Sequence, residues 1–154
     1  MGSRAATERE RAVTGTDPLK RFEAEHQEAL LALSKLEQAA SALEAGEGAG
    51  AQLAVIREIH EVLTTTVRRH NENEEWALFA VLGEEAPLAF FEEEHRALRS
   101  LEDELGAALT SRDAPARVPP VARTIVHLLR GHIQREDELL FPMARVLLGS
   151  GGLA

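Results

Sequence analysis

The sequence predicts an all-α protein, an up-down-up-down four-helix bundle built from two similar helical hairpins. The composition of the 154-residue chain points away from sheets: its acidic residues are 22 Glu and only 4 Asp, tyrosine is absent, and aromatic residues make up 4%. Apolar residues also recur at alternating steps of three and four in four segments separated by glycine or proline. That spacing is the period of a helix with one buried face.

The first helix is expected to begin at Asp17-Pro18, an N-cap followed by a proline in the first turn, after a polar tail over residues 1–16. The glycine-rich segment 46–50 is its expected end. One stripe of side chains predicts the face that packs into the bundle: Leu19, Phe22, His26, Ala29, Leu33, Leu36, Ala40 and Leu43.

The second helix is predicted over residues 51–82, with Gly83 ending it. Its stripe, too, alternates steps of three and four, and it includes three ionisable residues among apolar ones. The stripe comprises Leu53, Ile56, His60, Leu63, Val67, His70, Glu74, Ala77 and Val81.

The third helix is predicted from Pro87 to about Thr110, with Phe91, His95, Leu98 and Leu105 facing inward. The fourth is expected to start at Pro119-Pro120 and to continue to residue 148 through a kink at Pro142. Its stripe is Val121, Ile125, Leu128, His132, Glu136, Leu139, Met143 and Val146. With a second flexible tail over residues 149–154, one domain covers residues 17–148.

Composition and charge exclude several classes of function. The chain has no cysteine, which excludes disulfides, thiolate zinc sites and iron–sulfur clusters. The formal net charge of −9 argues against nucleic acid, whose binding depends on basic side chains. Apolar runs are too short for a membrane span, and the first residues lack the apolar core of a secretory signal. We therefore expect a cytoplasmic protein, a monomer or homodimer, that binds neither nucleic acid nor membranes.

The chain contains an internal repeat. Residues 22–26 read Phe-Glu-Ala-Glu-His, and residues 91–95 read Phe-Glu-Glu-Glu-His. A His-x3-Glu-x3-Leu-Phe pattern begins at His70 and recurs at His132. Self-similarity of this kind indicates two helical hairpins related by an approximate two-fold axis.

Six residues of the repeat are predicted to lie in one layer of the bundle. The number of residues between each histidine and the expected turn places His26 level with His70, and His95 level with His132. The same count across the second turn places Glu74 level with His95. Because all six lie on the stripes, we expect them to point inward. The six are His26, His70, Glu74, His95, His132 and Glu136.

Four imidazoles and two carboxylates in one buried layer predict a metal site. A buried charge without a partner costs several kcal/mol, whereas a metal neutralises the carboxylates and uses the imidazole lone pairs. Six ligands exceed what a closed structural zinc site needs, which favours a binuclear centre. Within each His-x3-Glu pair the two residues are about 6 Å apart along the helix, so one carboxylate can serve two metals. The ligand types suit iron, manganese or zinc.

Other ionisable residues are expected outside this site. His60 is about 15 Å along the helix from His70, and His127 points away from the stripe. Glu23 and Glu92 stand three residues before a stripe histidine, a spacing used in ferritin-like di-iron bundles, but the partner helices lack that family's pattern. We assign them to the surroundings of the site or to the surface. A solvated acidic face is expected from Glu25, Glu72, Glu75, Glu93, Glu94 and Asp137.

Over about residues 19–148, the repeated Glu-His and His-x3-Glu-x3-Leu-Phe motifs together resemble the hemerythrin-like, or HHE cation-binding, family. The resemblance implies a four-helix bundle around a non-haem di-iron centre. It implies that His26 and His70 are terminal ligands of one iron, and that His95 and His132 are those of the other. Two bridging carboxylates, Glu74 and Glu136, would complete the centre with an oxo or hydroxo bridge, and zinc or manganese are alternative metals.

Two positions depart from the oxygen-carrying hemerythrins. Those proteins have a second histidine four residues after the third-helix histidine, where this chain has Arg99, which we expect to reach solvent. They also have an Asp five residues after the last histidine, whereas here Glu136 follows at four. With two histidines per iron, the resemblance implies an open or water-filled position on each metal. The absence of tyrosine excludes a phenolate ligand.

The expected function is therefore a 4-His/2-Glu di-iron centre that binds or reacts with dioxygen, peroxide or nitric oxide. Consumption of peroxide is the chemistry expected of it if the protein is an enzyme. An alternative is an iron or oxygen sensor, or an iron store, that binds metal without turnover. A third is a purely structural bundle, in which changes to His70 or Glu136 would alter stability but not metal content.

Overall fold

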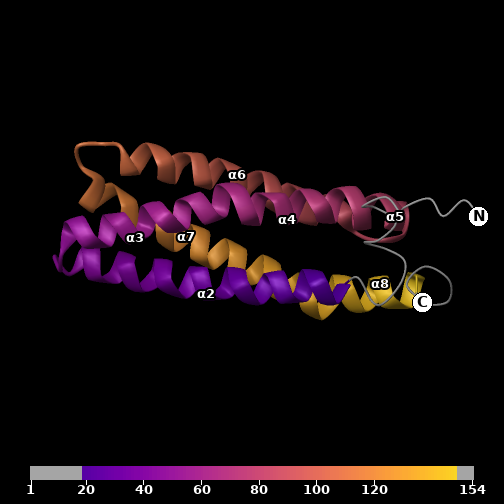
Figure 1. Ribbon diagram of the computed structural model, residues 1–154. Helices are drawn as coiled ribbons and strands as arrows, with labels where there is room; N and C mark the ends of the chain where they lie inside the picture. Colours follow the sequence, from indigo (N-terminus) through magenta and orange to yellow (C-terminus); the bar gives the residue numbers. More distant parts are fainter. Residues whose placement is uncertain (1–18, 149–154) are drawn as a thin grey trace, which may run out of the picture.

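The computed structural model describes residues 19–148 and arranges them in four long antiparallel helices (Figure 1). The first long helix is α2 (Leu19–Glu44). The second is divided into α3 (Ala49–Val62), η1 (Leu63–Val67), α4 (Arg68–Asn73), η2 (Glu74–Phe79) and α5 (Ala80–Leu82), and the short 3-10 turn η3 (Gly83–Glu85) follows it. The third is α6 (Leu88–Leu109), and the fourth is divided into α7 (Ala114–Arg135), η4 (Glu136–Leu140) and α8 (Phe141–Leu148). The segments η1, η2 and η4 are π-helical turns. The expected N-cap Asp17-Pro18 and the tails 1–16 and 149–154 lie outside the described residues.

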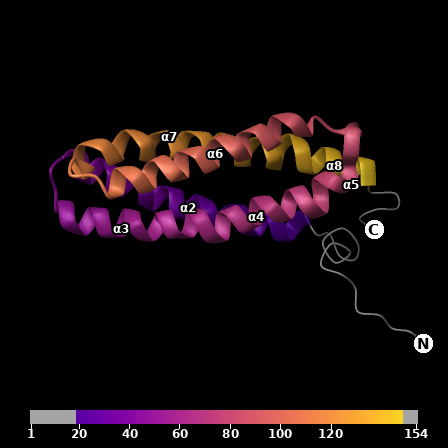
Figure 2. The ribbon, with the colours of Figure 1, turned by 90° about the horizontal axis from the view of Figure 1, so that it is seen from above.

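The helices pack as an up-down-up-down bundle, as expected. α2 lies against α3 and α7, and α6 lies against α7. The α2–α3 and α6–α7 turns are at one end of the bundle, and the α5–α6 connection is at the other (Figures 1 and 2). No strand occurs within residues 19–148. None of the helices in this part of the chain combines the length and apolar composition needed to cross a membrane.

Glycines end the first two long helices as the sequence indicates. Gly46 has φ 76° and donates its N–H to the Leu43 carbonyl at 3.1 Å, while the N–H of Glu47 bonds the Ala42 carbonyl at 2.9 Å. This is a Schellman motif, which requires a left-handed residue and therefore favours glycine. Gly83, with φ 58° and ψ −137°, ends α5 at a positive φ that also favours glycine.

The expected stripe of the first helix is confirmed along its whole length. All eight of its residues, from Leu19 to Leu43, are buried, the most exposed being Ala29 at 9%. A regular α-helix keeps the same face inward along its length, so residues counted at steps of three and four all point into the bundle.

The predicted start of the fourth helix is wrong by five residues. α7 begins at Ala114, and Pro119 and Pro120 lie inside it. The carbonyl of Asp113 accepts the N–H groups of Ala116 and Arg117, both at 2.9 Å. The fixed φ of the two prolines is compatible with a helix, but each lacks an N–H, so the carbonyls of Pro115 and Ala116, four residues earlier, lose their usual helical donor.

The π-helical turns shift the stripe in the second and fourth long helices. Val81, Leu139 and Val146 were expected inside, but they are 41%, 60% and 79% exposed. The buried residues are instead Leu82, Leu140 and Ala144, which each directly follow a residue of the predicted stripe (Val81, Leu139 and Met143). A π-turn inserts one extra residue, and one residue corresponds to a rotation of about 100° around a helix. The helix does continue through Pro142 to Leu148, as expected.

Two apolar clusters fill the bundle and leave a polar layer between them. The larger cluster lies toward the α2–α3 and α6–α7 turns and includes Leu33, Leu36 and Ile125. The smaller lies toward the opposite end and includes Leu19 and Phe141. The six predicted site residues belong to neither cluster. They are therefore closed off from solvent along the bundle axis by apolar side chains on both sides.

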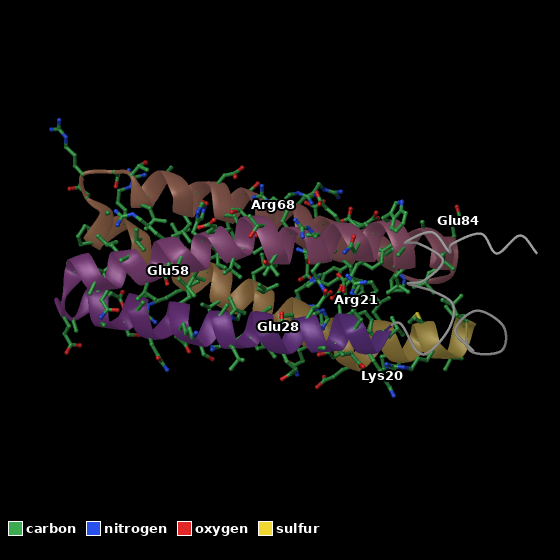
Figure 3. The ribbon with its side chains drawn as sticks, in the orientation of Figure 1. Lys20, Arg21, Glu28, Glu58, Arg68 and Glu84 are labelled. Carbon is green, nitrogen blue, oxygen red and sulfur yellow. The ribbon has the colours of Figure 1, made fainter. Side chains whose placement is uncertain are left out.

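Glu102 is a buried acidic residue that lies away from this layer. Glu102 occupies the place in α6 that Leu33 occupies in α2, seven residues after the stripe histidine, and both are 0% exposed. Its Oε1 accepts hydrogen bonds from Arg68 Nη2 at 2.6 Å and Nε at 3.0 Å, and Arg68 is labelled in Figure 3. Burial raises the pKa of Glu102, while Arg68 opposes that rise.

This pair yields a stability prediction. Arg68→Met is expected to lower the free energy of unfolding by about 3 kcal/mol, because it leaves a buried carboxylate without its partner. Glu102→Leu, which installs the residue of the other repeat, is expected to change it by less than about 1 kcal/mol, because Arg68 can turn to water. Urea unfolding followed by circular dichroism measures both. Equal losses in the two variants would contradict the assignment.

Candidate metal centre

The structure brings all six predicted site residues into one cluster. Its two overlapping groups share Glu74 and Glu136, the first adding His26 and His70 and the second adding His95 and His132. Within each group, one potential ligand atom per residue lies within 4.8 Å of the others. Every member is buried, the most exposed being His70 at 7%.

Each of the two glutamates directs one oxygen toward each pair of histidines. Glu74 Oε2 is 3.0 Å from His70 Nε2 and 3.5 Å from His26 Nε2, whereas its Oε1 is 3.3 Å from His95 Nε2. Glu136 Oε1 is 2.9 Å from His26 Nε2, whereas its Oε2 is 3.2 Å from the Nε2 of His132. Both carboxylates therefore lie between the histidine pairs.

The outer nitrogen of every site histidine is held by a carboxylate from another helix. Nδ1 of His70 donates to Glu25 Oε1 at 2.7 Å, and Nδ1 of His132 donates to Glu94 Oε1 at 2.9 Å. The other two bonds join the hairpins: His26 Nδ1 donates to Asp137 Oδ1 at 2.8 Å, and His95 Nδ1 donates to Glu75 Oε2 at 2.5 Å. These bonds leave all four Nε2 atoms facing the centre.

The assignment of these four carboxylates to a solvated acidic face is therefore wrong. Their side chains are at most 29% exposed, because each is drawn in toward a buried imidazole of a neighbouring helix. The repeat contains a signal that could have found them. Two directly precede a stripe histidine (Glu25 and Glu94), and two directly follow a His-x3-Glu glutamate (Glu75 and Asp137). The contacts obey the same two-fold relation as the repeat.

Phenylalanine rings enclose the histidines with the same symmetry. Phe141 stacks on His26 at 5.3 Å between ring centroids, and Phe79 stacks on His95 at 5.8 Å. Phe22 meets His70 edge-on, as expected of a residue that walls the site. In the second hairpin Phe91 does the same to His132. Phe79 is the last residue of η2 and Phe141 directly follows η4, so the two π-turns help to place these rings against the histidines.

Charge couples these groups strongly in the metal-free protein. Burial alone would lower the pKa of His26, but the neighbouring carboxylates of Glu136 and Glu74 outweigh burial and raise that pKa to about 11. Burial is outweighed in the same way at His70, whose pKa rises to about 9, and at His132, whose pKa rises to about 10. Burial would raise the pKa of Glu74, yet the neighbouring histidines hold it well below its usual value.

The donor set fits a bound cation. Both oxygens of Glu74 and of Glu136, and Nε2 of His26 and of His70, are buried without a hydrogen-bond partner. Nε2 of His95 faces Nε2 of His132 at 3.1 Å, although both rings already use Nδ1 as a donor. Buried polar atoms are rarely left unpaired. Metal ions held by these imidazole and carboxylate atoms would satisfy all of them.

The remaining candidates lie outside the cluster. His60 Nε2 bonds the Glu102 carbonyl at 2.8 Å, and His127 is exposed. Glu23 pairs with Arg145 of α8 at 2.9 Å, which places it at the surface. Arg99 is half-buried and acts on the charge of Glu102, so the expectation that it simply reaches solvent is only partly correct.

A bundle of four antiparallel helices around a buried His4Glu2 cluster defines a helical cation-binding protein. The family model described as "Hemerythrin HHE cation binding domain" matches residues 17–144. The chain therefore belongs to the hemerythrin HHE cation-binding family, and the resemblance noted from its motifs is confirmed. Comparison with curated proteins and with solved structures found no match.

The outer carboxylates lead to a prediction about metal affinity. Glu94→Gln is expected to weaken metal binding by about 10–100-fold, because His132 loses the charged acceptor that orients it and makes it more basic. The matched control is Glu93→Gln, since Glu93 is exposed and pairs only with Arg96 among the described contacts. Competition with a chromophoric chelator measures both affinities. An affinity of Glu94→Gln within about twofold of wild type would contradict this role.

The histidine pKa values predict how stability depends on pH without metal. A histidine pKa that is higher in the folded state stabilises the protein fully below the unfolded value of 6.5, and this is lost as pH rises through the folded value. For His70, His132 and His26 these folded values are about 9, 10 and 11. The melting temperature of chelated protein should therefore fall steadily above pH 6.5. Thermal denaturation from pH 6 to 10 tests this, with His127→Gln as a control of equal slope. A flat profile would contradict it.

Proposed function

We propose that the protein holds two iron ions and that this centre binds or reacts with dioxygen, peroxide or nitric oxide. In this proposal His26 and His70 hold one ion, His95 and His132 hold the other, and both glutamates bridge them. The observation that supports it most is that each of the two glutamates directs one oxygen toward each histidine pair. Iron in such a site supplies one-electron chemistry toward small oxygen- and nitrogen-containing molecules.

The chain itself contributes orientation, charge balance and exclusion of water. The four outer carboxylates fix the imidazoles with Nε2 inward, and the phenylalanine rings limit how far the imidazoles can tilt. The apolar clusters above and below keep bulk water away, which strengthens electrostatic interactions inside. As an enzyme, a cytoplasmic protein with this centre would consume peroxide.

Metal analysis combined with absorption spectroscopy tests the proposal. The protein is loaded with ferrous iron without oxygen and then exposed to air. We expect about two irons per chain and a new near-ultraviolet absorption band after exposure. Retention of zinc alone, or of no metal, with no spectral change in air would overturn the iron and oxygen assignments while leaving the bundle intact.

A further inference from the structure

A cavity of about 210 Å³ joins the metal centre to the surface on one side of the bundle. Its inner wall contains the buried His26, His70 and His132, and its outer wall contains Glu28 and Thr66, both exposed. Glu28 is labelled on α2 in Figure 3. The cavity lies between α2, α7 and the η1–α4 part of the second long helix. His95, in contrast, does not line it.

The two repeats differ at three places that form this cavity. Ala29 stands three residues after His26, whereas Leu98 stands three residues after His95 and is buried in the larger apolar cluster. A small side chain thus leaves space on the α2 side where a large one fills the α6 side. The π-turn η1 lines the cavity through Thr66 and Val67, and its counterpart in the second hairpin is regular α7.

The third difference is chemical. Asn71 follows His70, whereas Ile133 follows His132 at the equivalent place, and both line the cavity. Asn71 is only 2% exposed, and its Oδ1 has no hydrogen-bond partner. A buried amide oxygen without a partner is costly. A ligand that donates a hydrogen bond would remove that cost.

The size and charge of the cavity narrow the class of ligand. An apolar cavity of roughly 150 Å³ is enough to hold benzene, so a diatomic molecule would leave most of this space empty. Ala29, Val67 and Leu129 offer apolar contacts. The exposed Glu28 brings negative charge to the outer wall of the cavity, which disfavours the entry of anionic ligands. A neutral ligand with an apolar body and one hydrogen-bond donor fits these walls.

We propose that this cavity binds a small alkyl hydroperoxide, with its apolar body against Ala29 and Val67 and its O–H donated to Asn71 Oδ1. This inference rests on the proposed reactivity toward peroxide and assigns the substrate class. It makes the two metal positions unequal, since both histidines of one position, His26 and His70, line the cavity, whereas only His132 of the other position does. Asn71 acts as a substrate-binding residue, and Ala29 determines the size of substrate that enters.

The cavity itself can be tested independently of iron. Crystals of zinc-loaded protein under xenon pressure should show xenon beside Ala29 and Leu129, and Ala29→Leu should remove it. Ala24→Leu, an exposed change on the same helix, should retain it. Absence of xenon from the wild-type cavity would overturn the proposal.

The hydrogen bond is tested with tert-butanol, which has the alkyl body and the O–H but cannot react as a peroxide. In nuclear magnetic resonance titrations of zinc-loaded protein, tert-butanol should shift the Asn71 side-chain amide and the Val67 methyl signals. Asn71→Leu, which keeps the shape, should weaken binding about fivefold, as expected for one neutral hydrogen bond. Equal binding to both proteins would overturn the role of Asn71.

Iron-loaded protein then tests the substrate class. The ratio of its reaction rates with tert-butyl hydroperoxide and hydrogen peroxide should fall about tenfold in Ala29→Leu, equivalent to about 1.4 kcal/mol. An unchanged ratio in a protein that does consume hydrogen peroxide would overturn this inference alone. Reaction with neither peroxide would overturn both the proposed peroxide reactivity and the substrate assignment. The xenon and tert-butanol experiments would still show whether the cavity exists and whether Asn71 binds a hydroxyl group.

Discussion

Glu136→Gln is expected to lower the metal content from about two ions per chain to one or fewer. Its two oxygens face opposite histidine pairs, His26 on one side and His132 on the other, so the substitution weakens both positions together. Removing one partner from a buried charged cluster costs about 3–5 kcal/mol, which corresponds to roughly a thousandfold loss of affinity. Metal analysis after dialysis against a weak chelator measures the loss.

The matched control for this variant is Glu138→Gln, two residues further along the same helix. Glu138 is exposed and contacts only Gln134 among the described hydrogen bonds. The Glu138→Gln variant should therefore keep the wild-type metal content. Circular dichroism should show similar helicity for both variants, because glutamine has the shape of glutamate. Full metal content in Glu136→Gln would rule out the bridging role and would favour a purely structural bundle.

Removal of the metal is expected to lower the melting temperature by roughly 15 °C. Each ion present at a hundred times its dissociation constant adds about 2.7 kcal/mol, and for a chain of this size 1 kcal/mol shifts the melting temperature by about 2–4 °C. The comparison is thermal denaturation of metal-loaded and chelator-treated protein at pH 7. We expect helicity at 25 °C to persist, because protonated histidines still balance Glu74 and Glu136 and the apolar clusters are unaffected.

This experiment also separates the proposed function from its alternatives. Large loss of helicity at 25 °C on chelation would support a sensor whose fold depends on the metal. An unchanged melting temperature would contradict a metal centre, because an ion that binds only the folded state must stabilise it. Chelation should lower the melting temperature of Glu136→Gln less than that of the wild type, since the variant holds less metal.

The six site residues illustrate what sequence reasoning could achieve. Their spacing from turns and their places on the stripes set their height and their inward direction, and the structure brings all six together. The first helix was predicted with equal success, since every stripe residue from Leu19 to Leu43 is buried. Regular helical geometry is periodic, so counting along the chain is sufficient wherever the helix is undisturbed.

Errors arose where the period is broken or the partner lies on another helix. Leu139 was placed inside because the π-turn that begins at Glu136 carries no obvious signal in the sequence. Prolines often mark a helix start, which predicts one at Pro119, but α7 begins earlier, at Ala114, directly after its N-cap residue Asp113. Asp137 was assigned to solvent because its partner, His26, is 111 residues away along the chain.

The sequence by itself determined the helical bundle, its two-fold repeat, and the identity and level of the six central residues, because all of these depend on local periodicity. Only the tertiary structure decided which carboxylate holds which histidine, where Glu102 meets Arg68, and on which side the cavity opens at Ala29. These features depend on how side chains from separate helices share one volume. The difference between Ala29 and Leu98 produces a cavity on one side of the bundle only because of the residues that pack around each of them.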